Sequence, residues 1–573
     1  MRHGILSDTH SNYLSTSDPV NAGEARQCPF GHYGNAFTTK EPRRAIGAPR
    51  LPAVVGRMAS TGADGMALAA AADPMEKPFG RIADARASGV DRLPDDKHGQ
   101  THGNIPAGYT YFGQLVVHDL THSVAVDDHI GKPPAPGNLS TPVLDLDTIY
   151  GGGPARCPHL YQPPYLNAPP ASNDPDQYLF YLGRTAPATF PENEGLKSGE
   201  PRDLPRIDTQ SRGIADTEPP TSVTPLIHDE RNDDNLILSQ LVTQILLVHN
   251  KVASHLARNG DPTHGNSPLD RKASFELARH FVLKAYRRVV LHDYLRHLLF
   301  PSIHEDLLAG KMEAYKNLPV EFVFGVARAG HSMVRAAYDI NRHLDLSRSS
   351  LGRLMAFSSS TPGARLPLPA DWVVDWSRLL VMKDGDTPQF ARRISPFLAP
   401  TFVNGDLRSR RTGLNGSLSF HDLWRCYQFG VPTGQECAEQ LIGRSSPDFL
   451  QPADMLPTPT FIDLHPADNL IAALDKYHEF CEKTPLSYYI LQEAAKIGGN
   501  GRFLGPVGST IFARTILFAL QNAPSPHDTP PGQSDLSFAE IRKETGILKL
   551  ADLLKVSGMQ GPELAATIVA TLM

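Results

Sequence analysis

The chain has 573 residues, a formal net charge of −6 and 40% hydrophobic residues, enough apolar material to bury a large core. Acidic and basic residues nearly balance, and no basic stripe with interleaved aromatic residues is present, so a nucleic-acid partner is excluded. No stretch approaches the ~20 apolar residues of a membrane span, and the start lacks a Sec signal, so we expect a soluble protein, cytoplasmic or exported by a non-Sec route.

Proline and glycine concentrate in three stretches with poor apolar periodicity, 1–110, 151–226 and 524–535, which predicts long loops there. In 234–257 apolar residues recur at three-and-four spacing, as in a helix packed on one face. Further helices are predicted at 108–120, 269–299, 317–338, 418–429, 434–442, 486–497 and 506–521, with a short apolar pair after 547.

Strand signals are sparse, so the predicted fold is mainly α, with long irregular loops and little β-structure. We expect one large helical domain over 108–523, a mostly irregular wrapping segment over 1–107, and a C-terminal loop with short helices over 524–573. The five cysteines are odd in number and far apart, so neither a disulfide framework nor a zinc site is indicated.

Two polar residues stand on one face of the otherwise apolar predicted helix 108–120. Gln114 and His118 are four residues apart and therefore project from the same side. An imidazole beside an amide suits proton transfer to and from a peroxide, because its pKa lies near neutral pH. The alternative is a hydrogen-bonded core histidine.

Asp119 directly follows this histidine and faces another direction, which suits a cation site behind it. In the extended stretch that follows, Thr141, Val143, Asp145 and Asp147 alternate onto one side and offer hydroxyl, carbonyl and carboxylate oxygens. Such a set matches the ligand preference of calcium. The alternative is a polar turn with a solvated acidic face.

Together, FGQLVVHDLTHS and LDLDTIYGG resemble the distal-histidine and calcium-loop motifs of animal-type haem peroxidases, the peroxidase-cyclooxygenase superfamily. Their order and separation fit as well. The stretches 229–235 and 247–253 resemble the family's catalytic-arginine and His-Asn segments, and 324–333 resembles its proximal-histidine helix. Several motifs in one order are more specific than any single motif.

The resemblance implies roles for particular residues. His118 matches the distal acid and base, Gln114 lies near the peroxide or halide, and Arg231 completes the distal pocket. His331 matches the haem iron ligand and Arg328 a propionate partner. The matching calcium ligands are Asp119, Thr141, Val143, Asp145 and Asp147, and Asp422 falls where the family has the asparagine beside the proximal histidine.

Three positions depart from the family pattern, and a fourth separates two of its branches. Val117 replaces one ester-forming aspartate and Asp234 replaces the ester-forming glutamate, so the resemblance favours non-covalent haem b, or haem singly linked through Asp234. A carboxylate at Asp422 facing His331 would give the ligand more imidazolate character and lower the reduction potential of the iron. Arg328 stands where the family's lipid oxygenases carry a radical-forming tyrosine, which favours peroxidase chemistry.

The resemblance thus implies a peroxidase that uses hydrogen peroxide, through a ferryl state of its haem, to oxidise phenolic or other aromatic donors or halides. Three alternatives remain. The first is a haem-dependent fatty-acid dioxygenase of the same superfamily, and the second is a non-catalytic haem-binding or adhesive protein. The third is a helical protein without a cofactor, in which both histidines belong to the core.

Overall fold

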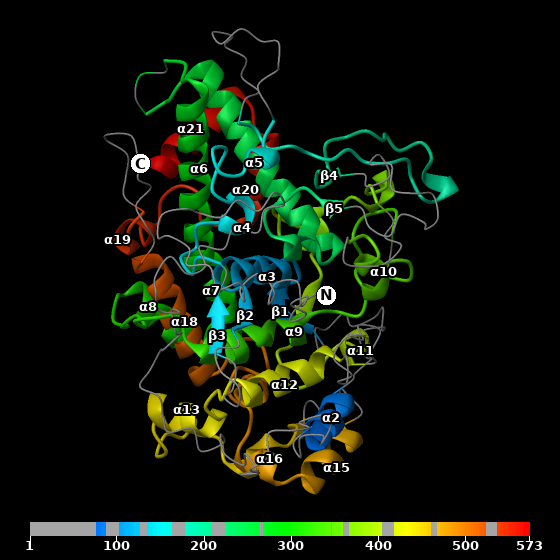
Figure 1. Ribbon diagram of the computed structural model, residues 1–573, viewed down its shortest axis with the longest axis vertical. Coiled ribbons are helices and arrows are strands. Elements are labelled where there is room, and N and C mark those ends of the chain that lie inside the picture. The colour runs from blue at the N-terminus through cyan, green and yellow to red at the C-terminus, as the bar shows by residue number, and fades with distance from the viewer. Residues whose placement is uncertain are drawn as a thin grey trace, which may run out of the picture.

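Helices dominate the part of the chain that the computed structural model describes (Figure 1). That part comprises residues 76–86, 102–126, 135–138, 140–162, 178–207, 224–263, 265, 267–344, 346–358, 366–403, 417–459, 467–522 and 536–573. Within these ranges the strands form three two-stranded antiparallel sheets: β1 (His102–Pro106) with β6 (Phe390–Arg392), β2 (Ser123–Val126) with β3 (Ala135–Asn138), and β4 (Arg206–Ile207) with β5 (Thr224–Pro225). The predicted mainly α fold is confirmed.

Three long helical segments organise the upper and middle parts of the molecule in Figure 1. They are α3 (Gly108–Leu120), α5 (Leu236–Asn259), and α6 (Arg271–Arg288), which continues as the π-helix η6 (Val289–Tyr294) and α7 (Leu295–Leu298). The side chain of Asn235 caps α5 by accepting a hydrogen bond from the backbone of Leu238. Apolar residues at helical spacing along α5 are buried, so this helix forms the centre of the core.

Helix α5 is also long and apolar enough to cross a membrane, with a mean hydropathy of 1.3 over its most apolar window. However, 78% of that window is buried inside the protein, as is usual for the core helix of a soluble domain.

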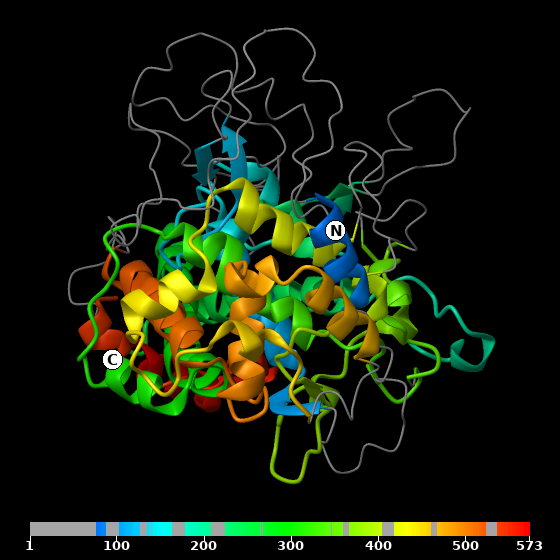
Figure 2. The same ribbon diagram turned by 90° about the horizontal axis from the view of Figure 1, so that it is seen from below.

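The lower part of the molecule contains a second group of helices (Figures 1 and 2). It comprises α12 (Leu418–Gln428), α13 (Gly434–Leu441), α15 (Asp468–Lys476), α16 (Glu479–Glu482), α17 (Leu486–Lys496) and α18 (Pro506–Gln521). The predicted helices 108–120, 418–429, 434–442, 486–497 and 506–521 each begin and end within one residue of the observed bounds. Smaller elements are α4 (Asp147–Tyr150), α8 (Pro301–Leu308), α10 (Leu351–Met355) and α11 (Pro400–Val403).

Helix α2 (Glu76–Ala85), near the start of the chain, packs against α12 and α15. Ser419 donates a hydrogen bond to the Ala83 carbonyl at 3.0 Å, and Arg86 Nε donates to the Pro396 carbonyl at 2.6 Å. The segment 1–107 was expected to be mostly irregular; α2 and β1 are ordered parts of it, and most of its remainder lies outside the described residues.

The predicted single helix over 317–338 is wrong. The chain forms a π-helix, η7 (Glu321–Gly325), then a 3₁₀-helix, η8 (Val326–Ala329), then one turn of α-helix, α9 (Gly330–Met333). Gly325 allows α17 to approach closely, because a Cβ atom there would lie 2.7 Å from a methyl carbon of Leu486. This packing changes the helical pitch directly before His331, and π-helical turns are frequent at functional sites.

The end of the chain packs on α6 and α5. Helices α19 (Phe538–Ile541), α20 (Leu550–Lys555) and α21 (Gly561–Leu572) contact them. Buried Lys284 and Arg288 donate hydrogen bonds to the carbonyls of Leu572 and Thr571 at 2.6 and 2.9 Å. Cations at a helix C-terminus stabilise it, so these bonds attach α21 to the core.

Candidate active site

A cavity lies between α3 and the segment η8–α9, in the middle of the molecule. Gln114 and His118 line it from α3, and Arg328 and His331 line it from the facing segment. The space between the protein atoms, counted with the open mouth, amounts to about 810 Å³. The two histidines that the sequence singled out therefore belong to one site.

His118 is fully buried, and its Nδ1 atom lies 3.1 Å from Oδ1 of Asn232. The amide orientation follows from its other end, because Nδ2 of Asn232 donates to the Thr148 carbonyl at 3.2 Å. Oδ1 can only accept, so the proton of a neutral His118 resides on Nδ1 and Nε2 keeps its lone pair. This tautomer is the one that a general base requires.

Asn232 and Asn235 were not identified from the sequence. Asn235 lines the cavity and donates a hydrogen bond from Nδ2 to Oε1 of Gln114 at 3.2 Å, which orients that amide. Amide side chains carry no charge or motif of their own. Their position close to Arg231 is the sequence feature that could have identified them.

Arg231 is placed differently from the expectation. The sequence assigned it to the distal pocket, but it does not appear among the described residues that line the cavity. Its guanidinium forms an ion pair with Asp229 and donates to the backbone carbonyls of Thr121 and His118 at 2.5 and 3.0 Å. Asp229, two residues earlier, holds the side chain behind the end of α3, where a cation is favourable. Arg231 thus supports His118 from its backbone side.

His331, in α9, has its Nδ1 atom 2.8 Å from Oδ2 of Asp422, which α12 carries. Burial acts to raise the pKa of Asp422, but the charges of His331, Arg328 and Arg86 outweigh it, and the pKa lies below its usual value. The carboxylate therefore stays ionised and fixes the proton of His331 on Nδ1. The predicted pairing of these two residues is present, and Nε2 is the atom suited to bind a metal.

Two arginines, one on the cavity wall and one in α12, have no anionic hydrogen-bond partner in the described part of the chain. Arg328 lines the cavity, and its buried Nε has no partner. Arg425, in α12 one turn after Asp422, has a pKa lowered to about 10, first by burial and then by the charge of Arg328. Paired guanidinium groups suit the carboxylates of a bound ligand. Arg425 was not predicted.

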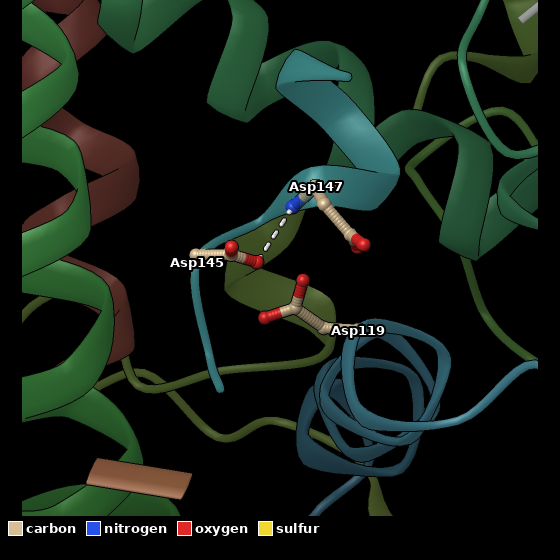
Figure 3. A group of neighbouring side chains, drawn as sticks. All are labelled: Asp119, Asp145 and Asp147. Atoms are coloured by element: carbon tan, nitrogen blue, oxygen red, sulfur yellow. Dashed lines mark hydrogen bonds between the residues drawn. The ribbon is translucent and has the colours of Figure 1, made fainter. Parts of the chain in front are cut away.

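The acidic cluster behind His118 is assembled as expected. Carboxylate oxygens of Asp119, Asp145 and Asp147 lie within 4.8 Å of one another, and Figure 3 shows Asp119 pointing from the end of α3 toward the loop that carries the other two. Burial and mutual repulsion raise the pKa values of Asp119 and Asp147 well above the usual range. One oxygen of each has no hydrogen-bond partner among the described residues. A divalent cation would relieve this repulsion.

The remaining predicted calcium ligands differ in their contacts. The Thr141 hydroxyl lies 2.8 Å from Oδ1 of Asp145 and from Oδ2 of Asp147, at the edge of the cluster. The Val143 carbonyl accepts a long hydrogen bond of 3.4 Å from Arg287. Threonine is therefore in place, whereas the valine carbonyl faces a cation of the protein.

The predicted attachment point for haem is not at the cavity wall. Asp234 is buried, and burial raises its pKa, but it is not among the described lining residues, whereas its neighbour Asn235 and also Val117 are. The weaker of the two sequence hypotheses, a single covalent link, gains no support from this geometry.

Two histidines face one cavity between helices, and each has its Nδ1 atom held by a neighbouring side chain. Residues 192–359 match the family model described as animal haem peroxidase, a segment that includes Arg231 and His331. No curated protein sequence matches the chain.

Two solved structures have folds similar to that of this chain. Peroxidase A from Dictyostelium discoideum is 15% identical over 94% of this chain and 99% of its own, with a TM-score of 0.54. The fatty acid alpha-dioxygenase of Oryza sativa is 14% identical over 86% of this chain and 79% of its own, with a TM-score of 0.51. Residues 192–359 are therefore similar to the animal haem peroxidase family, and the chain as a whole has the fold of these two solved structures.

Proposed function

We propose that this protein is a peroxidase that binds haem b without an ester link and reduces hydrogen peroxide at the expense of phenolic donors or halides. The observation that carries the proposal is the pair His118 and His331 on one cavity, with their protons fixed on Nδ1 by Asn232 and Asp422. One histidine is then equipped as a base and the other as a metal ligand.

The residues present fit the haem group. Nε2 of His331 would bind the iron, and Arg328 would hold a propionate, since a buried guanidinium nitrogen without a partner favours a carboxylate. When bound, haem supplies the redox chemistry of O–O cleavage and of electron withdrawal from the donor.

The protein moves the protons. Nε2 of His118 accepts a proton from peroxide and returns it to the departing oxygen, and the Asn232 amide keeps the ring in the required tautomer. Gln114, oriented by Asn235, offers a further polar group at the same wall. Arg231 acts by holding the backbone of His118 and Thr121, and its charge lies behind the base rather than beside the peroxide.

Asp422 distinguishes the proximal side. Its carboxylate accepts the Nδ1 proton of His331 more strongly than an amide would, and this would increase electron donation from the imidazole to a bound iron and lower its Fe(III)/Fe(II) potential. A low potential favours one-electron oxidation of phenols over the oxidation of chloride. We therefore propose phenolic or other aromatic molecules as the principal donors.

We further propose that Asp119, Asp145 and Asp147 bind one calcium ion with the Thr141 hydroxyl. The support is the raised pKa of two buried carboxylates and their unpartnered oxygens. Because Asp119 is the covalent neighbour of His118, the ion would fix the position of the base.

The decisive experiment compares the purified wild-type protein with His331→Ala and with His478→Ala, a control at an exposed histidine. Absorption near the Soret maximum, iron content and guaiacol oxidation with hydrogen peroxide are measured for each. The alanine at 331 should abolish all three, whereas the control should keep them. Unchanged colour and iron content in His331→Ala would contradict the proposal, and extraction into acid acetone shows whether the haem is covalently held.

A fatty-acid dioxygenase is the second candidate, since one structural neighbour has that activity. Arg328 occupies the position three residues before His331, where such enzymes carry the oxidising tyrosine, so we expect no oxygen uptake with palmitate or linoleate. Stoichiometric oxygen consumption with either fatty acid would replace the peroxidase proposal by this one.

A further inference from the structure

One tyrosine of the cavity wall has its own proton acceptor. Tyr109, in the first turn of α3, lines the cavity and is 6% exposed. Its hydroxyl donates a hydrogen bond of 2.5 Å to Oδ2 of Asp293. Tyr111 and Tyr294 line the same cavity, but neither contacts a carboxylate in the described part of the chain.

Asp293, which accepts this hydrogen bond, is buried in the core. It lies in the π-helix η6, where the extra residue in the turn changes the direction of the side chains. Oδ2 also accepts the backbone N–H of Leu550 at 2.8 Å, and burial raises the pKa of Asp293, so its carboxylate is a stronger base than an exposed aspartate.

The same tyrosine is close to solvent on its other side. The ring of His297 lies 4.7 Å from the ring of Tyr109, centroid to centroid, and its Nε2 is 3.7 Å from Oδ1 of Asp293. The His297 side chain is 32% exposed. Two aromatic rings in contact therefore join the wall of the cavity to the surface of the protein.

We propose that Tyr109 is a redox site that passes single electrons from donors at the His297 surface to the cofactor. This inference rests on the proposed peroxidase function. It extends the substrates to bulky one-electron donors, such as another reduced haem protein, that cannot enter the cavity.

The step balances within the named groups. Once peroxide has oxidised the cofactor, the phenol of Tyr109 gives up one electron to it, the O–H bond breaks, and the proton passes to Oδ2 of Asp293. A neutral phenoxyl radical remains. The external donor then returns one electron through the His297 edge, and the proton moves back from Asp293 to the phenol oxygen.

The test uses the holoprotein, ferrocytochrome c as the bulky donor and guaiacol as the small one. Wild-type protein frozen after one equivalent of peroxide should give a tyrosyl EPR signal, and it should oxidise ferrocytochrome c with peroxide. Tyr109→Phe should lose both, while guaiacol oxidation changes by less than about twofold. Tyr294→Phe, the matched cavity tyrosine, should keep the signal and the oxidation of ferrocytochrome c.

A second variant distinguishes loss of the relay from a folding defect caused by the substitution at Tyr109. Asp293→Asn keeps the phenol and an acceptor for Leu550 but cannot take the proton, so it too should lose the radical signal, with an unchanged Soret spectrum. An EPR signal and ferrocytochrome c oxidation that survive in both Tyr109→Phe and Asp293→Asn would overturn the relay. Guaiacol turnover in the wild type without any tyrosyl signal would overturn it as well and leave the peroxidase proposal intact, whereas absence of haem would refute both.

Discussion

Replacing Asn232 by leucine removes the side-chain oxygen that accepts the Nδ1 proton of His118 while preserving side-chain volume. The variant leaves a buried N–H without its acceptor, which costs about 1–3 kcal/mol, and the ring can regain a partner only by changing tautomer or orientation. Either change moves the lone pair of His118 Nε2 away from the position in which it accepts a proton. Since each 1.4 kcal/mol is tenfold, the proton-transfer step should slow by a factor between about 5 and 140.

Ligand binding isolates this effect from turnover. Hydrogen cyanide must lose its proton to bind ferric haem, whereas carbon monoxide binds ferrous haem without proton transfer. Stopped-flow measurement should therefore show slower cyanide binding in Asn232→Leu, an unchanged rate for carbon monoxide, and partial recovery in Asn232→Asp, which retains an acceptor oxygen. Glu230→Gln, in the same turn, is the matched control. Cyanide binding within about twofold of wild type in Asn232→Leu would refute the tautomer argument.

Other predictions concern stability, potential and the metal. Glu493 is buried, and its carboxylate accepts hydrogen bonds from the backbone N–H groups of Val507 and Gly508. Burial raises the pKa of Glu493 and these hydrogen bonds lower it; burial has the larger effect, and the pKa is about 7. The folded state then binds the proton more tightly than the unfolded state, so stability falls as the pH rises from about 4.5 to 7, by about 3 kcal/mol, and urea unfolding of Glu493→Gln should lack this slope. Asp422→Asn should raise the Fe(III)/Fe(II) midpoint potential in spectroelectrochemistry, and an unchanged potential would contradict the role of the carboxylate. Calcium chelation should lower guaiacol turnover before circular dichroism shows loss of helix, and simultaneous loss of both would argue against a local effect on His118.

Much of the helical framework could be predicted because its apolar residues recur at helical spacing and its ends carry local signals. The bounds of α3, α12 and α18 follow from such patterns. The π- and 3₁₀-turns before His331 could not be predicted, since they arise where Gly325 admits Leu486 from a helix about 160 residues further along. Periodicity within one segment carries no information about such contacts.

The candidate site also contains residues that could be predicted from the sequence and residues that could not. His118, His331, Asp422 and the three aspartates could be found because their chemistry is distinctive and their order is that of a known family. The orientation of Arg231 could not be predicted from the sequence. In the folded chain its guanidinium donates hydrogen bonds to the carboxylate of Asp229 and to a carbonyl at the end of α3. The surroundings of Asn232 and Arg425 are created only by folding, so neither residue could be picked out from the sequence.

The packing of α2 beneath α12 bears on the order of events during biosynthesis. The contact between Ala83 and Ser419 joins residues 336 positions apart, and α12 carries the carboxylate that orients His331. During synthesis on the ribosome the His331 side of the cavity therefore stays incomplete until α12, which ends at Gln428, has emerged. We expect haem to be captured only after this point, rather than to serve as a template for the first helices of the chain.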